Sequence, residues 1–168
     1  MRKILAAPLM FAALPLALAA AAPAAAEVAH IGASASPIAT AVSVSADHDM
    51  LYVSGLTPPP LNPDAPAGAP REYGDTKTQT IGVMKRIESV LKEQGLGMGD
   101  VVMMRVYLVG DPAKDGKMDF AGMMEGYKMF FGTPEQPNKP ARVTVQVASL
   151  VGPGQMVEIE VQAAKPKM

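Results

Sequence analysis

The sequence predicts an α+β fold in which a mixed sheet is covered on one face by two helices. Two stretches have the 3.6-residue apolar spacing of helices, and five runs alternate or are continuously apolar in the manner of strands. The order of these elements along the chain is β-β-α-β-α-β-β. Two helices suffice for one face of such a sheet, so the other face is left for solvent or for another subunit.

The chain begins with a segment typical of a secretory signal peptide. Residues 1–3 form a short basic region, and residues 4–23 are apolar and rich in alanine and leucine. The small residues that end at Ala26 are suited to cleavage before Glu27. We therefore expect residues 1–26 to be a signal peptide that is removed. An uncleaved membrane anchor is the alternative, which the prolines within the apolar stretch disfavour.

Residues 27–168 have the length of a single domain with one core. After cleavage we expect this domain to be periplasmic or secreted and not bound to a membrane. There is no cysteine, so disulfides and thiol chemistry are not available. The formal net charge is −1 and no basic block is present, which argues against nucleic acid as a partner.

The first half of this domain is predicted to contain two strands and a long loop. Residues 27–36 are small and polar and are expected to form a loose lead-in. Residues 40–46 and 50–55 alternate on either side of a turn cluster, which predicts a first hairpin. Residues 58–74 are dense in proline, alanine and glycine, which predicts a mobile loop that is either a functional flap or an insertion.

Two helices and a central strand follow the loop. Residues 76–94 carry an apolar stripe, with Asp75 or Thr76 as N-cap and Gly95 just beyond the end. Residues 101–109 are almost continuously apolar, as expected of a strand at the centre of a sheet. Residues 119–131 are predicted to be the second helix. Its inward-facing side chains are expected to be Phe120, Met123, Met124, Tyr127 and Phe131.

The last two strands carry the candidate chemistry. Residues 142–147 and 157–162 both alternate, and we expect them to pair as a closing hairpin. Arg142 would then lie on the same face as Glu158 and Glu160, where a cation with acids one strand away suits a small carboxylate-bearing molecule. From spacing alone, a surface salt bridge from Arg142 to one of the two glutamates is the alternative.

Five segments, taken in order, resemble the RidA/YjgF/YER057c/UK114 (Rid) family. They are LYVSG at 51–55, GLGMGDVV at 95–102, DF at 119–120 together with YKMFF at 127–131, KPAR at 139–142 with its strand, and VEIEV at 157–161. The resemblance extends over about residues 36–164. It implies a RidA-like (chorismate-mutase-like) fold and a homotrimer whose sites lie in clefts between subunits.

The same resemblance implies roles for individual residues. Arg142 is expected to anchor the carboxylate of the substrate, and Glu158 to position a water molecule. The loop before Glu158 is longer than usual, so Glu160 stays open as the alternative. Ser54 and Gly55 are expected to line the pocket.

Several positions depart from the family pattern and suggest a divergent, exported member. Ile38 and Thr144 are expected in the binding pocket, where the family often has a tyrosine and a cysteine. A helical asparagine of the family is replaced around Met124.

The activity implied by the resemblance is that of an enamine/imine deaminase. Such an enzyme hydrolyses 2-imino acids of the 2-aminoacrylate type to 2-oxo acids and ammonia, and needs neither cofactor nor metal. The two histidines, His30 and His48, have no cluster of ligands near them in the sequence, so we expect no metal site.

Two other functions stay open. The first is a non-catalytic trimeric module that binds small molecules or proteins, which the departures at Ile38 and Thr144 favour. The second is an endoribonuclease, against which the acidic balance counts.

Overall fold

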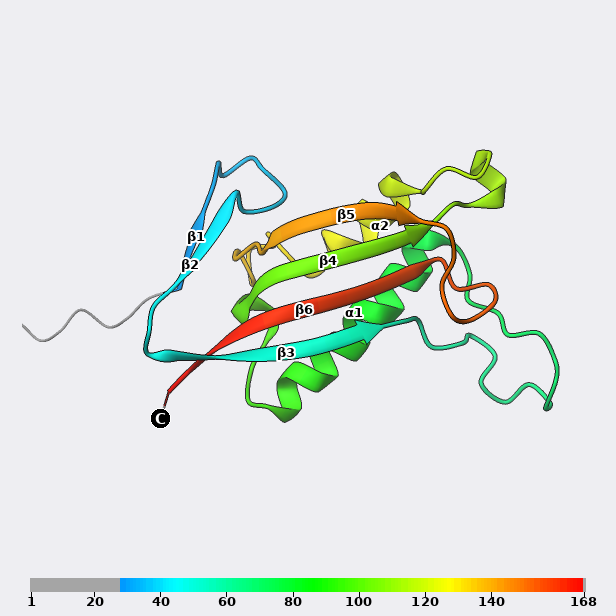
Figure 1. The fold of residues 1–168 in the computed structure, drawn as a ribbon, viewed down its shortest axis with the longest axis horizontal. Coiled ribbons are helices and arrows are strands. Elements are labelled where there is room, and N and C mark those ends of the chain that lie inside the picture. The colour runs from blue at the N-terminus through cyan, green and yellow to red at the C-terminus, as the bar shows by residue number, and fades with distance from the viewer. Residues whose placement is uncertain (1–27, 168) are drawn as a thin grey trace, which may run out of the picture.

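The computed structural model describes residues 28–167, which form a sheet, a small separate hairpin and two helices (Figure 1). The expected signal peptide, residues 1–26, lies outside the described residues. Among the residues that are described, no helix is long and apolar enough to cross a membrane.

The main sheet has four strands in the order β3-β6-β4-β5 (Figure 1). The long C-terminal strand β6 (Val157–Pro166) runs antiparallel to its two neighbours, β3 (His48–Leu56) and β4 (Val101–Val109). The edge strand β5 (Ala141–Val147) runs parallel to β4. The predicted mixed sheet is therefore confirmed, and the apolar run 101–109 is one of its two inner strands.

The N-terminal hairpin differs from the prediction. The loose lead-in expected over residues 27–36 is wrong in part, because β1 (Val28–Ile31) is a strand that pairs antiparallel with β2 (Ala41–Val44). The predicted pairing of residues 40–46 with 50–55 is also wrong, because β3 pairs with β6 instead. The alternation of apolar residues in both segments does predict strands. Strand β3 pairs with β6 because β6 has ten residues and β2 has only four.

Both helices cover the same face of the sheet (Figure 1). Helix α1 (Thr76–Glu93) begins at Asp75, whose carboxylate accepts a hydrogen bond from the Thr78 backbone N–H at 2.8 Å. It ends before Gly95, which has a φ of 75° that glycine adopts readily. Helix α2 (Phe120–Tyr127) is shorter than predicted.

The hydrophobic core fills the space between the helices and the sheet. Its largest members come from α1, β4, α2 and β6 and include Met84, Ile87, Leu91, Met104, Leu108, Met123, Tyr127 and Ile159. Each such side chain contributes roughly 1.5–3 kcal/mol by its burial. Phe120 was predicted to face inward, but its side chain is 44% exposed.

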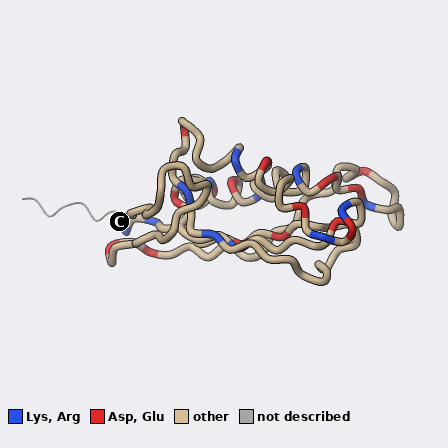
Figure 2. The backbone as a smooth tube through the Cα atoms, turned by 90° about the horizontal axis from the view of Figure 1, so that it is seen from above, with Lys and Arg blue, Asp and Glu red and all other residues tan. Residues whose placement is uncertain are grey.

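No layer covers the other face of the sheet within the described chain. Its exposed apolar side chains include Tyr52 at 70%, Val143 at 42% and Val145 at 39% of full exposure. We call this surface the open face. Figure 2, turned by 90°, shows the acidic and basic residues of the described part of the chain scattered along it, with no large basic block there.

The proline-rich loop between β3 and α1 contains no helix or strand, as its composition predicts. Hydrogen bonds nevertheless hold it together. Arg71 donates from Nη1 to the carbonyl oxygens of Asn62 and Pro63 at 3.0 and 2.9 Å. At the base of the loop, the buried amide of Gln79 donates to the Gly74 carbonyl at 3.0 Å.

Candidate functional site

The two strands that carry Arg142 and Glu158 are not neighbours. The predicted closing hairpin is wrong, because β4 lies between β5 and β6. Strand β5 pairs with β4 in parallel, and β6 pairs with the other side of β4 in the antiparallel sense. The segment between β5 and β6 therefore carries the chain across β4 instead of making a tight turn.

The register on β4 decides which way each side chain points. Arg142 is level with Met104, which is fully buried beneath the helices, so Arg142 lies on the helix-covered face. Glu158 is level with Tyr107, which lies on the open face. The prediction that Arg142, Glu158 and Glu160 share one face is thus wrong. The predicted alternation within each strand is correct. Whether residues of β5 and β6 point to the same face, however, is decided only by how the strands pair.

Arg142 lies among the side chains of α2. Its Cζ is 4.3 Å from the centre of the Tyr127 ring and 5.9 Å from that of Phe120. Its Nη2 is 3.1 Å from the Met124 sulfur. These contacts are of the cation–π and weak N–H···S kinds, and none of them neutralises the charge.

No carboxylate among the described residues forms a salt bridge with Arg142. The alternative of a salt bridge to Glu158 or Glu160 is therefore wrong. Arg142 Nη1 is buried and has no hydrogen-bond partner within the described chain. Burial lowers the pKa of Arg142, but a guanidinium stays charged at neutral pH. A half-buried cation without a counter-ion is costly, so this position favours an anionic ligand.

Two hydroxyl groups near Arg142 are also unsatisfied. The Tyr127 hydroxyl and Thr144 Oγ1 are buried and find no partner in the part of the chain that is described. Burial raises the pKa of Tyr127 to about 12, so its hydroxyl is a neutral donor at physiological pH. We refer to Arg142, Thr144, Tyr127, Met124 and Phe120 as the arginine cluster.

The two glutamates on the open face have different surroundings. Glu160 accepts a hydrogen bond from Arg105 Nη1 at 2.8 Å and one from the Tyr107 hydroxyl at 3.4 Å. Glu158 makes neither a salt bridge nor a side-chain hydrogen bond among the described residues. Its carboxylate lies against Gly55, where a Cβ atom would overlap it. Of the two, Glu158 is the carboxylate left available for chemistry.

A β-bulge brings Gly55 to this position. Val53 is paired with Val161 and Leu56 with Ile159, so Ser54 and Gly55 together face a single residue of β6. Bulges of this kind re-aim side chains and are common beside active sites. We refer to Glu158, Ser54 and Gly55 as the glutamate cluster.

The two clusters are far apart in one copy of the chain. Glu158 lies on β6, two strand spacings or roughly 10 Å across the sheet from β5, and Ser54 and Gly55 lie on β3, three strand spacings or roughly 14 Å away. The clusters also lie on opposite faces. The structure thus separates the predicted site residues into two groups and does not bring Arg142 to Glu158 within one copy.

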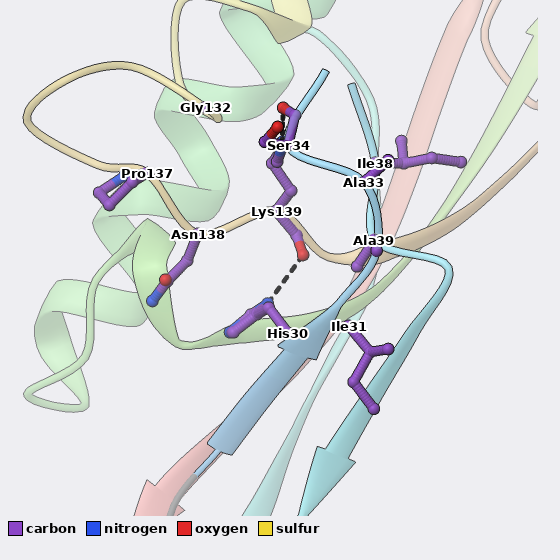
Figure 3. Close-up of a pocket in the computed structure, with 11 residues that line it drawn as sticks. His30, Ile31, Ala33, Ser34, Ile38, Ala39, Gly132, Pro137, Asn138 and Lys139 are labelled. Atoms are coloured by element: carbon purple, nitrogen blue, oxygen red, sulfur yellow. Dashed lines mark hydrogen bonds between the residues drawn. The ribbon is translucent and has the colours of Figure 1, made fainter. Parts of the chain in front are cut away.

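Ile38 belongs to neither cluster. It lines a cavity of about 400 Å³ between the end of β1, the loop 32–38 and the loop 132–139 (Figure 3). The sequence predicted Ile38 for the binding pocket but did not single out the polar residues beside it, because His30 lies far from Asn138 and Lys139 in the chain. Among the described residues, no group of three or more His, Cys, Asp or Glu is placed to hold a metal ion.

Comparisons with known proteins agree with this architecture. The model of the family described as Endoribonuclease L-PSP matches residues 30–165. A RutC family protein from Pyrococcus abyssi is 44% identical over 77 residues, which are 46% of this chain and 53% of that protein. The match thus spans about half the length of this curated relative.

Two solved structures illustrate the similarity of fold. YyfB, a Rid family protein from Yersinia pestis, has 25% sequence identity and a TM-score of 0.59, with 76% of this chain and 86% of that chain covered. A YjgF family protein from Neisseria meningitidis has 24% identity and a TM-score of 0.52, with 84% and 98% covered, and shows the fold alone. Since the family match extends over most of the chain, this protein belongs to the RidA/YjgF (Rid) family.

Proposed function

We propose that this protein is an enamine/imine deaminase that hydrolyses 2-imino acids of the 2-aminoacrylate type to 2-oxo acids and ammonia. The observation that carries the proposal is the unpaired guanidinium of Arg142, which is half-buried and has no counter-ion among the described residues. Arginine binds a carboxylate with two parallel hydrogen bonds and stays charged throughout the physiological range. A 2-imino acid supplies such a carboxylate beside its reactive carbon.

The arginine cluster matches a carboxylate in the number of its hydrogen-bond donors as well as in charge. A carboxylate accepts about four hydrogen bonds, and the cluster offers Arg142 Nη1 together with the hydroxyls of Thr144 and Tyr127. The second nitrogen, Nη2, becomes available when the weakly held Met124 sulfur is displaced. Binding in this way fixes the imine carbon for attack.

The glutamate cluster supplies the base. In the proposed reaction, Glu158 accepts a proton from a water molecule whose oxygen adds to the protonated C=N carbon. Glu158 then returns that proton to the nitrogen of the resulting amino alcohol, the C–N bond breaks as the hydroxyl forms the C=O of the 2-oxo acid, and the hydroxyl proton leaves with the nitrogen as ammonium. Atoms and charge balance without a cofactor, because the iminium carbon is already electrophilic.

The two clusters meet only if more than one copy takes part. We propose a homotrimer in which Arg142 of one copy lies opposite Glu158 of the next copy. The exposed apolar side chains of the open face, such as Tyr52, Val143 and Val145, support this assembly because they lack cover in one copy. We further propose export to the periplasm or beyond, where imino acids arise from oxidation of amino acids.

A trimeric binding module without catalysis is the second candidate. It is favoured by the separation of Ile38 from both clusters and by Thr144, which supplies a hydroxyl but no acid or base. Such a module would bind a 2-oxo acid or another carboxylate at Arg142 without turnover. An endoribonuclease has less support, since the described residues carry no large basic block (Figure 2).

The deciding experiment is a coupled imine-hydrolysis assay. An amino-acid oxidase with catalase generates 2-imino acids, and semicarbazide traps the imine that remains. We expect the protein to suppress semicarbazone formation, Arg142→Ala to abolish the suppression, and Arg86→Ala, at an exposed residue on α1, to retain it. A folded protein that suppresses no semicarbazone, but binds 2-oxo acids through Arg142, is the binding module.

A further inference from the structure

The Met124 sulfur lies where a ligand of Arg142 would compete with it. It is 3.1 Å from Arg142 Nη2 and comes from helix α2. A thioether is a weak hydrogen-bond acceptor and carries no charge, so it holds the guanidinium only loosely. Met124 thus decides whether Nη2 is free for a ligand. A change in the chemistry of its sulfur would change how tightly the guanidinium is held.

Met124 is open to small reagents. It is partly exposed, whereas its neighbour Met123 is fully buried in the core. Phe120, one turn earlier on α2, is 44% exposed, and its ring centre is 5.9 Å from Arg142 Cζ. The arginine cluster therefore borders the surface on the side of α2. A partly exposed thioether is oxidised more readily than one enclosed in the core.

Hydrogen peroxide converts a thioether to a sulfoxide. A lone pair of the sulfur attacks one peroxide oxygen, the O–O bond breaks as the S–O bond forms, and water is the second product. The sulfur is oxidised by two electrons and the peroxide is reduced by two, so no further reagent is needed. The flexible apolar side chain becomes a polar one, and its new oxygen is a strong hydrogen-bond acceptor.

At Met124 the new oxygen would lie beside a cation that lacks a counter-ion. The sulfur is already 3.1 Å from Nη2, so an oxygen bonded to it is within hydrogen-bond reach of the guanidinium. No carboxylate of the described residues forms a salt bridge with Arg142, so none competes for it. A hydrogen bond to a charged group changes an equilibrium constant by about tenfold or more.

We propose that Met124 is an oxidation site that closes the arginine cluster to its ligand. In the sulfoxide form, the Met124 oxygen accepts from Arg142 Nη2 and competes with the substrate carboxylate. This inference rests on the proposed function, in which Arg142 anchors that carboxylate.

The reaction class that supplies the substrate also supplies the oxidant. An oxidase that turns an amino acid into an imino acid passes two electrons to molecular oxygen, and it releases one hydrogen peroxide with each imino acid. Oxidation of Met124 would then report on the activity of such an oxidase and lower the hydrolysis of its product.

The test compares the purified protein before and after treatment with hydrogen peroxide, which catalase then removes. Mass spectrometry of proteolytic peptides locates the sulfoxides. With Met124 oxidised, we expect imine hydrolysis to fall by about tenfold or more and 2-oxobutanoate to bind more weakly by a similar factor. Two results would overturn the proposal: Met124 stays reduced while the exposed Met129 is oxidised, or 2-oxobutanoate binds equally before and after oxidation of Met124.

Two variants assign the effect to Met124. Met124→Leu keeps a side chain of similar size but has no sulfur. Its activity after peroxide, relative to its own activity before, is expected to stay close to one. Met129→Leu removes a methionine that is 58% exposed near the end of α2, and it should lose activity as the wild type does. Equal losses in Met124→Leu and the wild type would mean that another methionine is responsible, and the proposal would fall.

A spectroscopic signal separates this inference from the proposed function. In isotope-labelled protein, the side-chain Nε–H resonance of Arg142, assigned by its absence in Arg142→Lys, should shift on oxidation of the wild type but not of Met124→Leu. An unchanged resonance in protein with oxidised Met124 would overturn the proposal. If the resonance shifts and 2-oxobutanoate binding weakens, but the untreated protein hydrolyses no imine, the deaminase fails and the oxidation site stands.

Discussion

Arg142 and Glu158 point to opposite faces of the same sheet, and the strand β4 lies between the strands that carry them. A chain of this sequence therefore presents its candidate cation and its candidate base in two different places. Each is left without a partner of opposite charge among the described residues. Any chemistry that needs both residues has to join surfaces from two copies.

Mixing of two inactive variants is expected to restore activity. Arg142→Ala and Glu158→Gln each remove one half of the composite site, so each homotrimer should be inactive. In randomly mixed trimers, about a quarter of the sites combine an intact Arg142 from one copy with an intact Glu158 from the next. Imine hydrolysis is measured after the two variants are unfolded and refolded together, with separately refolded variants as control. Absence of recovery in correctly assembled mixed trimers would contradict a site shared between copies.

Replacement of Gly55 by alanine is expected to displace Glu158. The added Cβ would overlap the Glu158 carboxylate, which must move because it is the flexible end of its side chain. We expect imine hydrolysis to fall by about tenfold or more, with a small change in Tm. Gly97→Ala is the matched control, since the nearest atom to a Cβ there is 4.0 Å away. Equal activities of the two variants would show that the position of Glu158 does not matter.

The buried phenol of Tyr127 is expected to make stability fall at alkaline pH. Its pKa in the folded state is about 12, against 10.0 for an unperturbed tyrosine. The folded state thus holds the phenol proton more tightly than the unfolded state does. The stability gained from burying the neutral phenol is therefore fully present below about pH 10 and is lost as pH rises toward about 12. Denaturation of wild type and Tyr127→Phe by urea at several pH values should show a shallower decline in the variant. Tyr52→Phe, at an exposed position, should follow the wild type.

A charge on the open face is expected to prevent assembly. Val145 is 39% exposed in one copy, and the proposed trimer would bury it. Val145→Asp should yield a folded monomer, because an unpaired carboxylate is costly to bury in an interface. Light scattering coupled to gel filtration measures the mass, and circular dichroism checks the fold. Met129→Asp, at a residue 58% exposed near the end of α2, should stay trimeric. A trimeric Val145→Asp protein would place the interface elsewhere.

The loss of Gln79 is expected to destabilise the fold. This buried amide donates to the carbonyls of Gly74 and Gly154 at 3.0 and 3.1 Å and accepts from the Met156 N–H at 2.7 Å. Gln79→Ala leaves these groups unsatisfied, which should lower the free energy of unfolding by about 2–3 kcal/mol. Urea denaturation measures the change. Gln94→Ala, at an exposed helix end, is the control and should cost much less.

Much of the secondary structure could be predicted because its signals are local. The apolar stripe and the capping residues of α1 lie within a few residues of one another, as does the continuous apolar run of β4. The family resemblance likewise rests on short segments in order. β1 was missed because Val28–Ile31 is only four residues long and forms a strand through its pairing with β2.

The site could be predicted only in part. The sequence singled out Arg142 as the expected anchor for a carboxylate, which stays a prediction, and the structure adds that its guanidinium has no salt bridge among the described residues. The sequence left Glu158 and Glu160 unresolved, and only the ion pair of Glu160 with Arg105 distinguishes them. His30 and Lys139 were not recognised as neighbours, since 109 positions separate them along the chain.

The sequence by itself determined the types of most elements, the family and the alternation of residues within each predicted strand. The tertiary structure decided which strands are neighbours, and with that the face on which Arg142 and Glu158 lie. The physical reason is that side-chain alternation has a period of two and belongs to each strand alone. The relative phase of two strands depends on long-range hydrogen-bonded pairing, and a shift of one residue turns every side chain to the opposite face.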